Sequence, residues 1–203
     1  MKKLLALLLA LVMIFALAAC GESDKKDDDK ETQGTTLAPA TTIVGSWKYD
    51  ISMSGESMGY EGVKATIDLQ VQQTFKEDGT VTMVVNEDKL LASMPAFEEA
   101  LVNYMIENYY EGDESVRSAV EEMVAGMNMG ATMMESFNSI QATYTVEGDK
   151  LTITGQIDAD VEVPTEEYTF KFVSNTVELY AANANTEEAF AMYGVDKLVL
   201  NPA

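Results

Sequence analysis

The stretch from residue 43 to residue 86 alternates apolar and polar residues, and this pattern limits what the chain can fold into. Two runs, 43–54 and 63–75, place an apolar residue at nearly every second position, and a third run, 81–85, follows the turn Glu77-Asp78-Gly79. Successive side chains of a strand point to opposite faces, so each run has one buried and one solvated face. The stretch therefore predicts three consecutive strands that border one core.

The same alternation returns after residue 139 and raises the expected number of strands to eight. The later runs are 142–146, 151–161, 168–172, 177–179 and 198–200. One-sided strands in sequential order are typical of a closed up-and-down barrel, because closure leaves no edge strand. We therefore expect a mainly β fold, an eight-stranded antiparallel barrel.

The lengths of the connections predict that one end of this barrel is more elaborate than the other. In an up-and-down barrel successive connections alternate between the two ends. The tight turns near Asp78, Gly148 and Asn175 fall at one end, and the long connections 55–61, 87–139 and 182–194 fall at the other. We expect the long connections to surround a mouth, where loops most often carry function.

Residues 87–139 replace the alternation with a helical spacing of apolar residues, from Phe97 to Tyr109 and from Val116 to Met134. Gly112 and Asp113 between these runs are typical of a helix stop and an N-cap. Pro95 disfavours helix at the residue before it, so the first helix is expected to start near Pro95. The segment predicts a two-helix insertion between the third and fourth strands.

The first 42 residues differ in composition from the rest of the chain. Lys2 and Lys3 precede an uncharged run that is too short for a good membrane-spanning helix, and the run ends in Leu17-Ala18-Ala19-Cys20. Residues 20–42 are rich first in Asp and Lys and then in Thr and Pro, which predicts a disordered tether before a domain at 43–203.

The Leu17 to Cys20 segment resembles the lipobox of bacterial lipoproteins. This resemblance implies that residues 1–19 are a signal peptide and that Cys20 carries a diacylglyceryl group and a fatty acyl chain such as palmitate. Two such signals are enough for stable anchoring, which places the protein outside the cytoplasm on a cell membrane. An ordinary signal peptide, or an uncleaved anchor with an incidental Cys20, remains the alternative.

The charge of the domain excludes some partners. Six of the 34 acidic residues and five of the 13 basic ones precede residue 43, which leaves 28 acids against eight bases. Such a surface repels nucleic acid and anionic membranes, so no nucleic acid partner is expected. A solubilising coat is the simpler interpretation of the acids, and a site for cationic ligands is the other.

The residue types available exclude several kinds of catalysis. The chain has no His, and Cys20 is its only Cys, so triads with a His base and His-rich zinc sites are ruled out. Six of the 13 Met residues lie between residues 105 and 134, where packing is a simpler role than Cu(I) binding. We expect a protein that is not an enzyme, without a metal and without a cofactor beyond the acyl group on Cys20.

Gly45-Ser46-Trp47 at the start of the first strand resembles the G-x-W signature of lipocalins, and the layout is similar to lipocalin-like domains of bacterial lipoproteins. The resemblance covers residues 43–86 and 140–200. It implies that Gly45 and Trp47 form a structural signature at the closed end. A T-D-Y-like motif and a late Arg are missing here, and the helical insertion has no counterpart in the usual lipocalin.

Two functions remain open from the sequence. In the first, the barrel binds a small hydrophobic ligand or lipid beneath a helical lid. In the second, the barrel is filled and the protein is a non-catalytic envelope module that binds another envelope protein. For the first, the inward residues expected near the mouth are Met53, Met58, Met83, Val85, Ile157 and Tyr168, together with Met127 and Met134 of the insertion.

Lipidation of Cys20 is directly testable. Wild-type protein extracted from membranes should carry the mass of a diacylglyceryl group and partition into a detergent phase, because the acyl chains are its anchor. A Cys20→Ser variant should lose both properties in the same mass and partition measurements. Wild-type protein that stays in the aqueous phase without the added mass would contradict the localisation.

Overall fold

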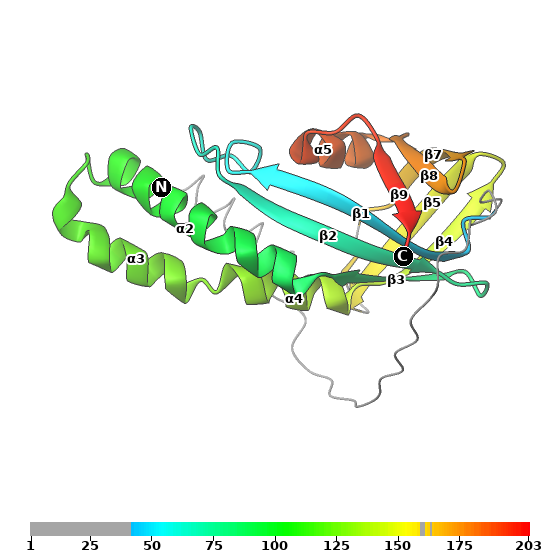
Figure 1. Cartoon of the computed structure of the whole chain (residues 1–203), viewed down its shortest axis with the longest axis horizontal. Coiled ribbons are helices and arrows are strands. Elements are labelled where there is room, and N and C mark those ends of the chain that lie inside the picture. The colour runs from blue at the N-terminus through cyan, green and yellow to red at the C-terminus, as the bar shows by residue number, and fades with distance from the viewer. Residues whose placement is uncertain (1–41, 159–160, 163) are drawn as a thin grey trace, which may run out of the picture.

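The computed structural model describes residues 42–158, 161–162 and 164–203 (Figure 1). These residues form a closed antiparallel β-barrel of eight strands with helices packed against it. Cys20 and the expected tether lie outside the described residues.

Each of the eight strands pairs with the strands before and after it in the ring. Their bounds are β1 Gly45–Ser54, β2 Thr66–Phe75, β3 Thr80–Val85, β4 Gln141–Glu147, β5 Lys150–Asp158, β7 Glu166–Val173, β8 Thr176–Ala181 and β9 Leu198–Pro202. A two-residue strand, β6 Val161–Glu162, pairs with β5. The sheet order is β4-β3-β2-β1-β9-β8-β7-β5-β6, and a further pairing of β4 with β5 closes the ring. The predicted mainly β barrel is thus confirmed.

The helices are α2 Glu87–Tyr109, the short η1 Glu114–Val116, α3 Arg117–Gly126, α4 Met129–Ser139 and α5 Ala184–Tyr193. The prediction that the first helix starts near Pro95 is wrong. Helix α2 starts at Glu87, where the side chain of Asn86 accepts a hydrogen bond from the Lys89 amide at 3.0 Å.

Burial explains why α2 tolerates Pro95. An interior proline costs about 3 kcal/mol, since it removes one helical hydrogen bond and crowds the carbonyl four residues earlier. Leu90, Met94 and Phe97 are each at most 5% exposed, and burying such side chains contributes about 1.5–3 kcal/mol apiece. Pro95 and Leu91 lie on the exposed side of the helix. The buried face therefore outweighs the proline.

The second predicted helix is two helices. Asn128 takes a left-handed conformation (φ 47°, ψ 43°) between α3 and α4 and interrupts the helix. A Cβ on Gly130 would lie 3.2 Å from Leu91 Cδ2 and 3.3 Å from Met94 Cγ of α2. The missing side chain at Gly130 therefore allows α4 to pack closely on α2.

Strands β1 and β2 extend beyond the positions at which their other neighbours, β9 and β3, pair with them. They pair with each other at ten positions, whereas β3 pairs with β2 at five and β9 pairs with β1 at two. Figure 1 shows this two-stranded ribbon reaching beyond β3, with α2 alongside it and α5 over β1. Gln70 accepts a hydrogen bond from the Asn86 amide at 2.9 Å, and the Asp68 amide donates to Ser93 Oγ at 3.1 Å. The start of α2 thus occupies the β2 edge that β3 leaves open.

The helical segment belongs to the core of the barrel. Leu90, Phe97 and Leu101 of α2 are at most 2% exposed and lie in the same cluster as the inward side chains of the strands. At the far tip of the ribbon, Tyr60 packs edge-on against Tyr104, with ring centroids 5.7 Å apart. This burial favours a helix that fills the barrel end over a lid that opens freely.

The other end is closed by Trp47 and tight turns. Trp47 is 5% exposed, and its Nε1 donates to the carbonyl of Ile43 at 2.7 Å. Tyr144 of β4 stacks edge-on against Phe75 and donates its hydroxyl to the Lys76 carbonyl at 2.7 Å. Both arrangements tie strand ends to the neighbouring turn.

Two adjacent leucines test whether α2 is part of the core. Leu90 is fully buried, and Leu91 is 43% exposed. Leu90→Ala should lower the free energy of unfolding by about 2–5 kcal/mol through lost burial and a cavity, and Leu91→Ala by less than about 1 kcal/mol. Urea denaturation of both variants measures the difference. Equal and small effects would place α2 outside the core.

Candidate functional site

The residues expected to contact a ligand do not converge on one place. Met53, Val85 and Tyr168 are buried, and Met58, Met83 and Met134 pack partly exposed against the core. Met127 forms the C-cap of α3, and the Ile157 side chain lies outside the described side chains. Met53 pairs with Ile67 of β2 and Met83 with Gln73, six residues apart. At about 3.3 Å per residue this is roughly 20 Å, too far for one small ligand.

One residue of that set, Tyr168, lies beside other ionisable side chains inside the barrel. Glu166 and Tyr168 are two residues apart on β7 and pair with Ile153 and Leu151 of β5, which are both buried. Both side chains therefore lie on the inward face of the barrel. The Tyr168 hydroxyl donates a hydrogen bond to Glu166 Oε2 at 2.9 Å.

Two other elements add aromatic side chains to this cluster. Helix α5 contributes Phe190, whose ring centroid is 5.9 Å from that of Tyr168, and Tyr193 one turn later. Strand β1 contributes Tyr49, which shares the inward phase of Trp47 and Ile51. We call Tyr49, Glu166, Tyr168, Phe190 and Tyr193 the Glu166 cluster.

Burial is the main cause of the electrostatic behaviour of these groups. It raises the pKa of the Glu166 carboxyl, and the hydrogen bond from Tyr168 opposes that shift in part. Burial also raises the pKa of Tyr193 to about 12, and the charge of Glu166 adds to this. Burial also raises the pKa of Tyr49, with smaller contributions from Tyr193 and Glu166. Burial likewise raises the pKa of Tyr168, with smaller contributions from Glu166, Tyr49 and Tyr193.

The ionisable groups of the cluster are desolvated, but three of the residues are not fully buried. Surrounding atoms desolvate Tyr49, Glu166 and Tyr193 strongly enough to shift all three pKa values. The same three side chains are nevertheless only partly buried, so each keeps accessible surface. Solvent therefore still reaches part of each of these three residues.

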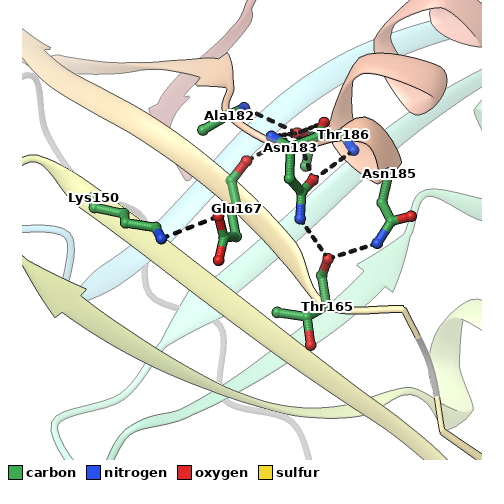
Figure 2. Close-up of polar contacts among 7 residues, drawn as sticks. All are labelled: Lys150, Thr165, Glu167, Ala182, Asn183, Asn185 and Thr186. Atoms are coloured by element: carbon green, nitrogen blue, oxygen red, sulfur yellow. Dashed lines mark hydrogen bonds and ion pairs between the residues drawn. The ribbon is translucent and has the colours of Figure 1, made fainter.

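Helix α5 is held over the cluster by hydrogen bonds at its first turn (Figure 2). Asn183 and Thr186 form a capping box, and the fully buried Thr186 donates its hydroxyl to the Glu167 carbonyl at 2.9 Å. Asn183 and Asn185 both donate side-chain amides to the Thr165 carbonyl, at 2.8 and 2.9 Å. Since Glu166 lies between Thr165 and Glu167, the same contacts fix α5 relative to the buried carboxyl.

Basic side chains near the cluster lie on the outer face of the sheet. Lys150 pairs with Glu167 at 3.0 Å, and Lys171 and Lys197 both pair with Glu178, whose pKa falls to about 2 through hydrogen bonds from Lys197, Tyr180 and Lys171. Within the described part of the chain no Lys or Arg pairs with Glu166. The carboxyl inside the barrel thus has a phenol as its partner in place of a cation.

The residues described by the structure offer no group of three His, Cys, Asp or Glu side chains that would hold a metal ion. None of the helices in those residues is long and apolar enough to span a membrane. Comparison with protein-family models, curated proteins and solved structures finds no match to this chain.

Sequence reasoning identified Tyr168 and missed the other four members of the Glu166 cluster. Glu166 stands in phase with Tyr168, Phe170 and Phe172, so an acidic residue at an inward position was visible in the pattern. The predicted strand began at Tyr168 and therefore did not include Glu166. Tyr49 lies in the alternating run 43–54, but nothing in the sequence joins it to a carboxyl 117 positions later.

The raised pKa of Glu166 predicts a pH-dependent stability. The folded state binds the Glu166 proton more tightly than the unfolded chain, so the free energy of unfolding falls as pH rises from the ordinary glutamate pKa through the raised one. Glu166→Gln should remove the contribution of residue 166 to this fall in the free energy of unfolding. Glu167→Gln, a change on the outer face, should retain that contribution. Denaturant titrations between about pH 4 and pH 8 measure the slopes. A Glu166→Gln curve parallel to wild type would contradict the raised pKa.

Proposed function

We propose that this protein is a binding module: a lipoprotein anchored through Cys20 outside the cytoplasm, whose lipocalin-like barrel holds a small molecule beside the Glu166 cluster. The observation that carries the proposal is the inward-facing Glu166 carboxyl, which is only partly buried and, in the described residues, has the Tyr168 hydroxyl in place of a cation as its partner. In this view the acyl chains keep the barrel near the membrane, and the chain performs no catalysis.

The composition of the cluster supports binding over simple core filling. A buried polar group costs free energy unless it is fully hydrogen-bonded, and an ionisable carboxyl costs more. Leu or Phe at position 166 would fill a purely structural barrel at lower cost. Retention of Glu166 with Tyr49 and Tyr193 is therefore the pattern of a ligand site, in which a few convergent polar groups interrupt an apolar wall.

The size of the barrel supports a single small ligand. An eight-stranded barrel is wide enough to be filled by side chains or to hold one small molecule. In this chain α2 adds the buried Leu90, Met94 and Phe97 to the core, and α5 adds the buried Phe190 beside Tyr168. A ligand the size of a long lipid would have to displace α2, so we favour a compact molecule.

An envelope interaction module is the second candidate, and one observation favours it. Tyr109 and Tyr110 are 39% and 41% exposed where α2 ends, and Met123 of α3 is 41% exposed. The hairpin of α2 and α3 extends beyond the ends of the strands (Figure 1). Exposed aromatic residues and Met are enriched at protein interfaces.

Native mass spectrometry of the membrane-extracted protein tests the proposed function. Wild type should retain one small molecule per chain, and Glu166→Leu should lose it, because leucine removes the carboxyl and fills space while relieving a desolvated polar group. Glu167→Gln is the matched control and should retain the molecule. Bare wild-type protein in the native spectrum, with no small molecule in an organic extract, would refute binding and favour the envelope module.

A further inference from the structure

We infer that the molecule bound beside the Glu166 cluster is a small organic cation, with an ammonium group held by the Glu166 carboxylate and the surrounding rings. This inference rests on the proposed function and names the chemical class of its ligand. It follows from charge, from the aromatic surroundings and from the arrangement of the three elements that meet there.

Glu166 has no cationic partner among the described residues. In the described residues Glu166 faces no basic side chain, and its only hydrogen bond from a side chain comes from the neutral Tyr168 hydroxyl. By contrast, Glu167 and Glu178 on the outer face are each paired with Lys. A cationic ligand would complete inside the barrel the kind of ion pair that the outer face makes with its own lysines.

Aromatic rings from three elements surround the Glu166 carboxyl. Tyr49 from β1, Tyr168 from β7, and Phe190 and Tyr193 from α5 bring four rings to the region of one acid. The faces of aromatic rings carry negative potential and attract ammonium groups, and enclosed sites strengthen the attraction because the cation is desolvated. A carboxylate with several rings is therefore suited to an amine or a quaternary ammonium group.

The net negative charge of the whole domain also favours a cationic ligand. From residue 43 onward the chain has 28 acids and eight bases, so its surroundings concentrate cations and repel anions. An anionic ligand would meet the desolvated Glu166 carboxyl with no basic group in the cluster to offset the repulsion. A neutral ligand would gain nothing from the field and could only accept or donate hydrogen bonds.

Binding of a cation should couple to the proton on Glu166. The titratable groups that face Glu166 are Tyr168 on β7, Tyr49 on β1 and Tyr193 on α5, and all three phenols stay neutral below pH 10 because their pKa values are raised. Strand β5 presents the apolar Ile153, while Lys150 pairs with Glu167 on the outer face. Below pH 10 Glu166 is thus the group of the cluster that changes charge, and a cation that prefers the carboxylate should bind more tightly as pH rises through the raised pKa of Glu166.

Matched pairs of probes test the inference on the full membrane-extracted protein. Choline is compared with the uncharged alcohol in which carbon replaces its quaternary nitrogen, and butylammonium with butanol, by isothermal titration calorimetry at several pH values. At least one cation should bind about tenfold more tightly than its neutral counterpart, and its affinity should rise with pH. In Glu166→Gln the preference for the cation and its pH dependence should both disappear, and in Glu167→Gln both should remain.

The outcomes separate this inference from the proposed function. Equal binding of charged and neutral probes, or a co-purifying molecule identified as neutral or anionic, would overturn the cationic ligand and leave the binding module intact. A cation preference that persists in Glu166→Gln would show that the acidic surface attracts cations without this site, and would also overturn it. Wild-type protein that binds no probe and carries no small molecule would refute both.

Discussion

The structure depends on a mismatch between the long β1–β2 ribbon and the strands beside it. Ten residue pairs join β1 to β2, but β3 and β9 cover only five and two positions of their outer edges. The remaining half of the ribbon has an apolar inward face, including Ile51, Met53, Ile67 and Leu69, and would otherwise expose unpaired edges. Helix α2 covers it from the β2 side and α5 from the β1 side. The helices are therefore required by the sheet.

This arrangement also explains how a polar cluster persists inside a β-barrel. Helix α5 reaches the ribbon from β8, and its capping box binds the start of β7 through Thr165 and Glu167. The same contacts bring Phe190 and Tyr193 over Tyr168 and Glu166. A strand in that place would continue the alternation with apolar side chains, whereas α5 places the buried Phe190 and the partly buried Tyr193 there.

The sequence predicted the regular elements well, and its errors have identifiable causes. Strict alternation and turn residues such as Gly79 and Gly148 located all eight strands of the ring, because strand periodicity reflects burial on one face. Local rules failed at Pro95 and Asn128. At Pro95 the burial of three neighbouring side chains overrode a backbone preference. At Asn128 a left-handed residue redirects the chain so that Gly130 can approach α2, and no local signal separates such a break from a continuous helix.

The sequence by itself determined the strands of the barrel, the helical character of residues 87–139 and the exclusion of histidine chemistry. These properties follow from residue type and local periodicity, which need no knowledge of distant contacts. Only the tertiary structure decided that Tyr49, Glu166 and Tyr193 meet, and that the expected methionines are spread along the barrel. The physical reason is that the side chains of a barrel interior come from strands far apart in the chain, and strand register together with the docking of α5 sets which of them become neighbours.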